Sequence, residues 1–89
     1  MASANREAIF STNFRRDLRY WIEANRSVAL RILQLVEAII REPFIGIGKP
    51  EPLKGELGGL WSRRITDEHR LLYRVRPDRV EFVQARYHY

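Results

Sequence analysis

A small set of side chains in this sequence could carry acid–base chemistry. It comprises one carboxylate, Glu51, in a Gly- and Pro-containing segment, several arginines that follow it, and His88 in the C-terminal run. The arginines are Arg63, Arg64, Arg70, Arg74 and Arg86. Cleavage of an RNA phosphodiester needs a base for the 2′-OH proton, cations for the phosphorane charge and an acid for the departing 5′-oxygen. The set supplies all three groups, so the sequence suits RNA cleavage.

The C-terminal run is unusual for a chain end. Termini usually fray and carry small polar residues, whereas here Tyr87 and Tyr89 flank His88. A histidine, with an ordinary pKa of about 6.5, keeps a useful protonated fraction near neutrality, and tyrosine rings can stack on unpaired bases. We therefore expect a docked terminus that takes part in function.

Taken one at a time, these residues also have ordinary structural explanations. A single loop glutamate is usually solvated. His69 lies beside Asp67 and Glu68 in an expected hairpin turn, where we favour a turn or ion-pair role over catalysis. Trp21 and Trp61 are expected in the core. Residue types alone therefore do not establish the reaction.

The charge balance favours a polyanionic partner. The 89 residues hold 16 Lys and Arg against 11 Asp and Glu, a net charge of +5, and 14 of the cations are arginine. Arginine pairs bidentately with phosphate and stacks on bases, which favours RNA or DNA. An acidic protein also fits, and a solvated basic surface with no partner is the plain alternative.

The sequence argues against metal and cofactor sites and against a membrane span. The chain has no cysteine, no His pair at metal-ligand spacing and no Gly-rich phosphate loop, so we expect neither a metal nor another cofactor. The apolar stretch 28–40 is interrupted by Arg31, Gln34 and Glu37, which argues against a membrane span. We expect a cytoplasmic protein of one domain, residues 1–89, in which residues 1–5 are a flexible leader.

Hydrophobic spacing predicts the elements of the first half. A β-type run over 7–11 ends in a Ser-Thr-Asn cluster that suits a helix cap. Two amphipathic helices follow, separated at 25–27, where Ser27 is expected to cap the second helix before it ends ahead of Pro43. The expected apolar stripes are Phe14, Leu18, Trp21 and Ile22, then Val28, Ile32, Leu35, Val36 and Ile39.

The second half changes to a period of two. Residues 46–53 are expected to form a loop held by Phe44 and Ile47, and residues 60–66, 70–76 and 79–87 are expected to form antiparallel strands. In the middle strand, alternation places Leu71, Tyr73 and Val75 on the core face and Arg70, Leu72, Arg74 and Arg76 on an open, cationic face.

The alternation fails midway through 79–87, so either both faces are partly covered or a bulge resets the register. The predicted fold class is α+β, with an N-terminal strand and helical hairpin packed on a mainly antiparallel, four- to five-stranded sheet.

Three blocks of sequence resemble one known family. They are residues 48–54 (GKPEPLK), 60–71 (LWSRRITDEHRL) and 86–89 (RYHY). The chain resembles the YoeB-type toxins, which belong to the RelE-like toxins of bacterial type II toxin–antitoxin systems. The resemblance covers most of the chain and is densest from residue 43 onward. It implies a metal-independent endoribonuclease that contacts both ribosomal subunits, cleaves mRNA in the A site and is silenced by a YefM-like antitoxin.

The resemblance also implies roles for individual residues. Glu51 matches the family's general base, Arg70 its transition-state arginine, His88 its general acid and Tyr89 its terminal aromatic residue. The substrate-binding set is Lys49, Lys54, Arg63, Arg64 and Arg86, with Glu68 in support.

Some alternatives stay open. The helix faces are more arginine-rich than the family pattern, which leaves the antitoxin contacts and a homodimer interface undefined, and the sequence does not define a codon preference. The runner-up function is a non-enzymatic basic module that binds the ribosome, or another target such as DNA gyrase, without cleavage. Related scaffolds that poison gyrase lack the acid–base set, so Glu51 and His88 disfavour that target.

Overall fold

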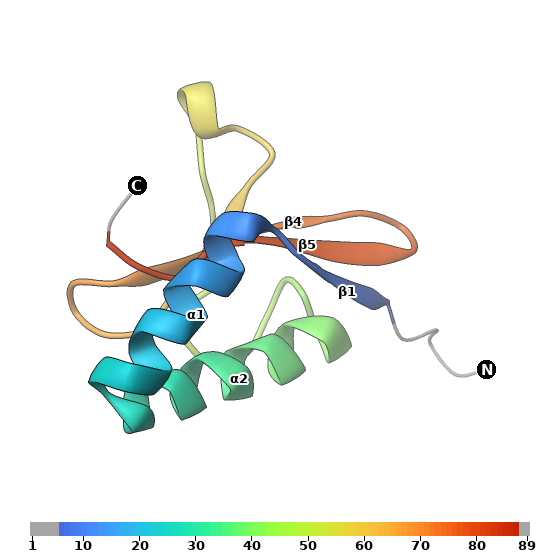
Figure 1. Cartoon of the computed structure of the whole chain (residues 1–89). Helices are drawn as coiled ribbons and strands as arrows, with labels where there is room; N and C mark the ends of the chain where they lie inside the picture. The colour runs from blue at the N-terminus through green and yellow to red at the C-terminus, as the bar shows by residue number, and fades with distance from the viewer. Residues whose placement is uncertain (1–5, 88–89) are drawn as a thin grey trace.

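Two helices pack on a five-stranded sheet in the computed structural model, which describes residues 6–87 (Figure 1). The elements, in chain order, are β1 (Glu7–Phe10), α1 (Thr12–Ala24), α2 (Arg26–Arg41), β2 (Glu51–Pro52), the 3-10 turn η1 (Gly55–Leu57), β3 (Trp61–Arg64), β4 (Arg70–Val75) and β5 (Arg79–Gln84). The predicted α+β class, with a strand and helical hairpin ahead of the remaining strands, is confirmed. The expected leader, residues 1–5, lies outside the described residues.

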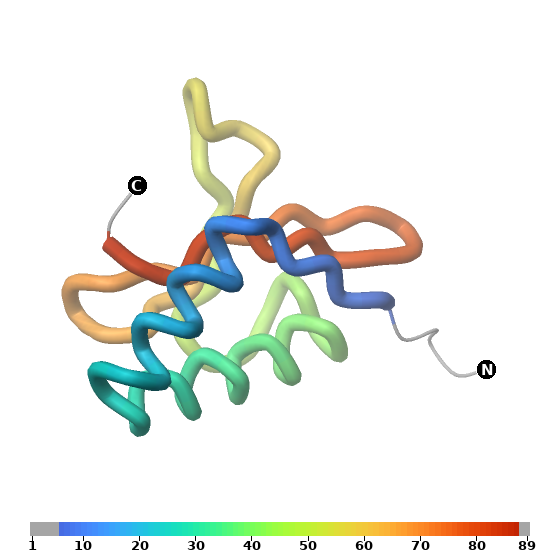
Figure 2. Tube along the Cα trace, viewed as in Figure 1, coloured from blue at the N-terminus to red at the C-terminus, as the bar shows by residue number. Residues whose placement is uncertain are grey.

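The sheet order is β1-β5-β4-β3-β2. Strand β1 runs parallel to β5, with Glu7 opposite Arg79 and Phe10 opposite Phe82, and the other pairings are antiparallel. The first and last strands of the chain are therefore neighbours (Figure 2). Within residues 6–87, no helix is long and apolar enough to cross a membrane.

Helix α1 is capped by Ser11, the first residue of the predicted capping cluster. The Ser11 side chain accepts a hydrogen bond from the Phe14 backbone N–H at 3.0 Å, and its hydroxyl donates to Val83 O at 2.8 Å. Phe14 and Trp21 are buried as predicted, whereas Ile22 is 55% exposed. Eight residues beyond Phe14, Ile22 lies about 80° around the helix from Phe14, and about 100° from Trp21, so it leaves the buried face.

Helix α2 begins two residues earlier than predicted, because Asn25 and not Ser27 is its cap. The Asn25 side chain accepts from Val28 N at 3.3 Å, and Ser27 instead donates its hydroxyl to Asn25 Oδ1 at 3.0 Å. The predicted core stripe is otherwise confirmed, since Ile32, Leu35, Val36 and Ile39 are buried and Val28 is half-buried against them.

The irregular alternation in the last strand has a specific cause. Leu72 pairs with Gln84 and Tyr73 with Phe82, so Val83 is an extra residue in β5, and the bulge that was one of two predicted explanations is present. The reset puts Ala85, like Phe82, on the buried side, where both are 0% exposed.

Leu72 departs from its predicted exposure. Its parity places it on the sheet face opposite the helices, as predicted, yet it is 2% exposed. Its neighbours on that face, Arg70 and Arg74, are only half-exposed, and long aliphatic stems of this kind can cover apolar surface while their charged heads reach water. The face is therefore cationic but not wholly open.

Candidate active site

The sheet brings three of the predicted site residues to one face. Glu51 lies on the short edge strand β2, directly opposite Ser62 of β3, and it is exposed. Ser62 and Arg64 share a face of β3 because side chains alternate, and Arg64 is paired directly with Arg70 of β4. Glu51, Arg64 and Arg70 therefore lie on the sheet face that the helices leave uncovered.

The Arg64–Arg70 pair sets the charge of this face. Like charges directly opposite each other on neighbouring strands are destabilising. Within residues 6–87, the Nε of Arg64 is buried without a hydrogen-bond partner. The salt bridges of that same part of the chain all join Arg74, Arg76 and Arg79 to Asp78 and Glu81, at the other end of β4 and β5. Two cations that face each other without a carboxylate suit a bound anion such as phosphate.

Arg70 is held by backbone carbonyls. Its Nη1 donates to Thr66 O at 2.8 Å, Asp67 O at 3.1 Å and His69 O at 3.1 Å. The Thr66 hydroxyl in turn accepts from the backbone N–H groups of Glu68 and His69, which fixes the turn itself. These carbonyls hold one edge of the Arg70 guanidinium in place but do not neutralise its charge. A group that stabilises a developing negative charge must be held in this way before the reaction begins.

Arg63 is not a substrate contact in this conformation, and the prediction is wrong for it. Its side chain is 0% exposed. Nη1 donates to Ile47 O at 3.0 Å, Nη2 to Glu42 O at 2.6 Å and Ile45 O at 3.0 Å, and Nε to the Tyr73 hydroxyl at 3.2 Å. Arg63 instead holds the loop between α2 and β2 against the sheet.

The alternation of β3 was the signal that could have found this role. Arg63 shares its parity with Trp61 and the buried Ile65, so it faces the helices, whereas Arg64 faces away. Tyr73 completes the arrangement by donating its hydroxyl to Pro43 O at 2.7 Å. Burial raises the pKa of the Tyr73 phenol, and the hydrogen bond from Arg63 opposes that rise.

The same loop is pinned immediately before Glu51. Gly48 has φ +82°, and a Cβ there would lie 2.9 Å from Leu35 Cδ2, so a side chain does not fit. Gly48 O accepts from Arg64 N at 2.6 Å. Lys49, the next residue, also has a positive φ of 52° and is exposed. These constraints fix the approach of the chain to Glu51.

Phe44 and Ile47, the predicted anchors of the loop, are 47% and 42% exposed. Phe44 contacts Trp61 with ring centroids 5.1 Å apart, but Arg63 supplies the polar attachment that the sequence did not predict. Trp21 is buried as predicted, whereas Trp61 is only half-buried at the margin of the core.

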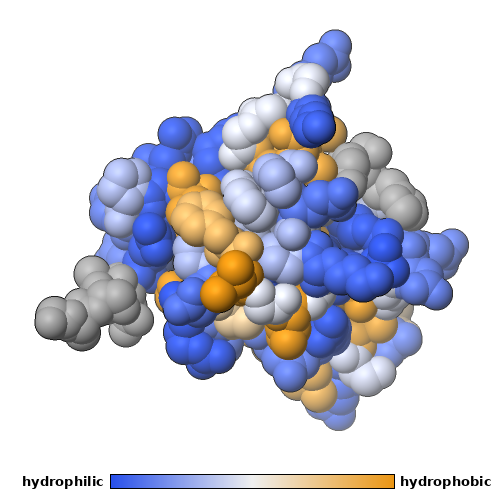
Figure 3. All heavy atoms as spheres, turned by 180° about the vertical axis from the view of Figure 1, so that it is seen from behind, coloured by the Kyte–Doolittle hydropathy of each residue, from blue (hydrophilic) through white to orange (hydrophobic). Residues whose placement is uncertain are grey.

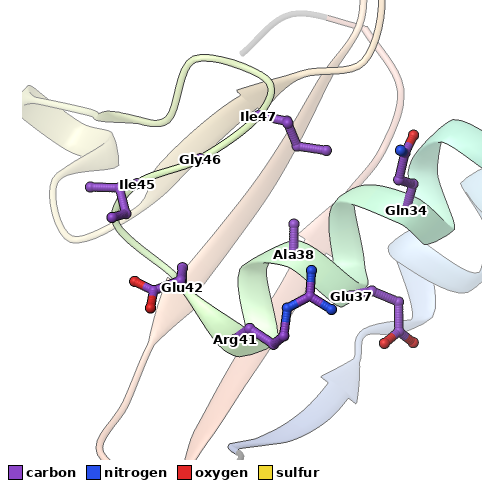
Figure 4. A pocket seen from close by; sticks show the side chains of 8 residues that line it. All are labelled: Gln34, Glu37, Ala38, Arg41, Glu42, Ile45, Gly46 and Ile47. Carbon is purple, nitrogen blue, oxygen red and sulfur yellow. The ribbon is translucent and has the colours of Figure 1, made fainter.

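A groove of about 550 Å³ lies between α2 and this loop (Figure 4). Its lining residues are Gln34, Glu37, Ala38, Arg41, Glu42, Ile45, Gly46 and Ile47. The two predicted catalytic residues within 6–87, Glu51 and Arg70, are not among them. Seen from behind, the molecule is mainly hydrophilic, with hydrophobic side chains gathered near the middle of that face (Figure 3). The groove belongs to the helix layer and is separate from the Glu51–Arg70 face.

The remaining predicted residues are distributed around the sheet. Lys54 is exposed and precedes η1, and Glu68 is exposed in the turn before β4. The Arg86 guanidinium carbon lies 3.4 Å from the Tyr20 ring centroid and 4.6 Å from that of Tyr87, so its charge is placed between two aromatic rings. His88 and Tyr89 lie outside the described residues.

His69 lies in the turn before β4, as predicted, but in a different role from an ion pair. Among residues 6–87 it forms no salt bridge with Asp67 or Glu68. Its Nδ1 accepts a hydrogen bond from the Tyr87 backbone N–H at 2.7 Å, and its ring meets Trp21 edge-on with centroids 4.8 Å apart.

Comparison with known proteins identifies the family. Residues 10–89 match the model of the YoeB-like toxin of bacterial type II toxin–antitoxin system. Toxin YoeB of Mycobacterium bovis is 59% identical over 73 residues, which are 82% of this chain and 86% of that protein. Toxin YoeB of Streptomyces coelicolor is 52% identical over 80 residues, 90% of this chain and 95% of that protein.

Solved structures agree with this match. The YoeB/ParE toxin from Agrobacterium tumefaciens superposes with a TM-score of 0.88 at 40% identity, covering 93% of this chain and 99% of that one. The YoeB dimer and the YoeB–YefM complex from Staphylococcus aureus give TM-scores of 0.87 and 0.84 at 37% and 38% identity, each covering 97% of this chain and 100% of theirs. The chain therefore belongs to the YoeB-like toxins of bacterial type II toxin–antitoxin systems.

Proposed function

We propose that this toxin is a metal-independent endoribonuclease that cleaves mRNA in the ribosomal A site, using the 2′-OH of the message as the nucleophile. The observation that carries the proposal is the Arg64–Arg70 pair, two opposed cations on the sheet face that also holds Glu51. Such a face attracts a phosphodiester and is costly without one.

The reaction assigns one role to each group. Glu51 takes the proton of the 2′-OH, whose oxygen attacks the adjacent phosphorus. Arg70, fixed at the turn by three carbonyls, stabilises the charge that develops on the phosphorane, and Arg64 opposite it binds the same phosphate. His88 protonates the 5′-oxygen as it leaves, and Tyr89 stacks on a base. The products are a 2′,3′-cyclic phosphate and a free 5′-hydroxyl.

The partners follow from this activity and from the relatives. A protein that cuts messages on the ribosome acts in the cytoplasm and contacts both ribosomal subunits around the A site. The S. aureus relative has been solved with YefM and as a dimer, so we propose a YefM-like antitoxin and a homodimer for this chain as well. The cationic sheet face suits an acidic antitoxin segment that folds on binding.

The test is cleavage of a defined message on purified ribosomes, read by primer extension. Wild-type toxin is expected to produce discrete breaks in the A-site codon, and Glu51→Ala is expected to abolish them. A message with a single 2′-deoxy substitution just 5′ of the break should stay intact, because its nucleophile is missing. Stalled but intact RNA from the wild-type toxin would instead favour the non-enzymatic module, and cleavage of the deoxy message would exclude 2′-OH attack.

A further inference from the structure

The chain leaves β5 at Gln84 through a short segment, residues 85–87, whose backbone is held by groups from elsewhere in the fold. The Ala85 N–H donates to Asp17 Oδ2, and Ala85 O accepts from the Trp21 indole N–H, both at 2.9 Å. Both partners lie on α1. This segment therefore does not end the sheet as a loose strand but is attached to the first helix.

Tyr87, the last described residue, is held from the other side. Its N–H donates to His69 Nδ1 at 2.7 Å, and its carbonyl accepts from the Arg70 backbone N–H at 3.1 Å. Two consecutive residues, His69 at the end of the turn and Arg70 at the start of β4, thus bind both backbone polar groups of one tyrosine. The second of them is the proposed transition-state arginine.

Burial does not explain the conformation of Tyr87. Its side chain is 58% exposed, yet its φ is +67°, a left-handed value that is uncommon outside glycine. The bond to His69 Nδ1 therefore acts on a residue that would otherwise leave this conformation easily. The His69 ring is itself fixed by its edge-on contact with Trp21, at an interplanar angle of 80°.

We infer that His69 is a positioning residue, which uses its Nδ1 lone pair to fix the backbone of Tyr87, one residue before the proposed general acid. The inference rests on the proposed function, because it assigns His69 a role in aligning the general acid with Arg70. Catalysis is sensitive to such alignment, since a displacement of about 1 Å can cost about a hundredfold in rate.

Two substitutions of similar size separate the effect of the His69 Nδ1 lone pair from the effect of losing the imidazole ring. His69→Asn keeps an acceptor oxygen two bonds from Cβ, where Nδ1 stands, whereas His69→Leu places a methyl group there. Amide hydrogen exchange at Tyr87, measured by NMR, should be slow in the wild type and in the Asn variant and at least about tenfold faster in the Leu variant. Equal Tyr87 protection in all three proteins would overturn the anchor.

Cleavage kinetics on ribosomes test the consequence. His69→Leu should lower the single-turnover rate at saturating toxin at least about tenfold with the half-saturating toxin concentration unchanged, and His69→Asn should stay within about threefold of the wild type. A wild-type rate in the Leu variant, or an Asn variant as slow as the Leu variant, would overturn the positioning role. If His69→Leu does not fold, as judged by circular dichroism, His69→Ala removes the same acceptor with less bulk.

The two proposals fail in distinguishable ways. A wild-type toxin that does not cut RNA on ribosomes refutes the proposed function and with it the catalytic part of the inference, while the Tyr87 exchange experiment still decides whether His69 anchors the segment. If the wild type cleaves RNA and the His69→Leu variant cleaves it at the same rate, only the positioning role is refuted.

Discussion

Three arginines close in sequence show how environment decides the role of a residue. Arg63 is fully buried and bound to loop carbonyls, Arg64 faces the opposite side of the same strand, and Arg70 lies across from Arg64 with one edge anchored to a turn. The side chains are identical, but only the last two present charge to the outer face of the sheet. Structure and function should therefore respond separately to their removal.

The Arg64–Arg70 pair gives the first prediction. Arg70→Ala should lower cleavage by about 10²–10³, the usual cost of removing one well-placed charge stabiliser. It should lower the melting temperature much less than Arg63→Ala does, because relief of the like-charge contact with Arg64 offsets part of the loss of its three hydrogen bonds to the turn. Single-turnover cleavage and thermal denaturation of the same preparation provide the measurement. A large loss of stability together with activity would mean that Arg70 serves mainly to build the turn.

Arg63 should behave in the opposite way. Arg63→Ala leaves four internal acceptors without their donor, and a buried polar group left unsatisfied costs about 1–3 kcal/mol, so the loss in unfolding free energy should be at least about 3 kcal/mol. Urea denaturation measures it, with Arg64→Ala as the matched control on the neighbouring residue. An Arg63→Ala protein as stable as that control would refute the structural role.

At the level of elements, helices and strands could be predicted from periodicity, and the errors have local causes. The cluster Ser11-Thr12-Asn13 was recognisable as a capping segment because it directly precedes an apolar stripe, and the structure selects Ser11 within it. At the second helix Ser27 was predicted, but the hydrogen bond from Val28 N goes to Asn25. The bulge at Val83 was recognisable as a break in alternation but not as a position.

The candidate site was predictable in part for the same reasons. Strand alternation alone indicated that Arg70 faces away from the helices, and its pairing with Arg64 follows only once the register of β3 and β4 is known. The burial of Leu72 and the wrapping of the α2–β2 loop around Arg63 depend on long-range packing, for which a single sequence carries no direct signal.

Tyr73, which helps to attach the α2–β2 loop, should make the stability of the protein depend on pH in the alkaline range. Burial raises the pKa of Tyr73 in the folded protein above its unfolded value of 10.0. The neutral Tyr73 side chain therefore contributes its full stability to the fold below about pH 10. This contribution is lost as the pH rises through the pKa of Tyr73 in the folded protein, because the phenolate cannot donate a hydrogen bond to Pro43 O.

The measurement is unfolding free energy against pH for the wild type and Tyr73→Phe. The variant should be less stable at pH 8 by about 1–3 kcal/mol, because Arg63 and Pro43 each lose a partner, and the difference should shrink above about pH 10. Tyr20→Phe, on α1, is the control for loss of a tyrosine hydroxyl as such. Parallel curves for the wild type and Tyr73→Phe up to pH 11.5 would contradict the assignment.

At the scale of the whole molecule, two groups of arginines stand apart from the salt-bridged ones of β4 and β5. One is the pair Arg64 and Arg70 on the sheet face. The other lies on α1, where Arg15, Arg16 and Arg19, all exposed, line a hollow of about 320 Å³ with Thr12. The described part of the chain gives none of these three arginines a salt bridge, and Arg15 and Arg19 are one helical turn apart, where like charges repel. A ribosomal RNA backbone would relieve that repulsion.

Neutralising the helix surface should therefore weaken ribosome binding without slowing the chemical step. The triple change Arg15→Gln, Arg16→Gln and Arg19→Gln lowers the net charge from +5 to +2, and it should make the slope of log affinity against log salt shallower by about two to three, with an unchanged single-turnover rate at saturation. The control is the equal charge change Arg26→Gln, Arg31→Gln and Arg41→Gln on α2. An equal loss of affinity in both triple variants would mean that only the net charge matters and would contradict a contact at α1. A shallower salt slope in the α1 variant alone would assign the contact to α1, because counterions are released only where a cation binds a phosphate.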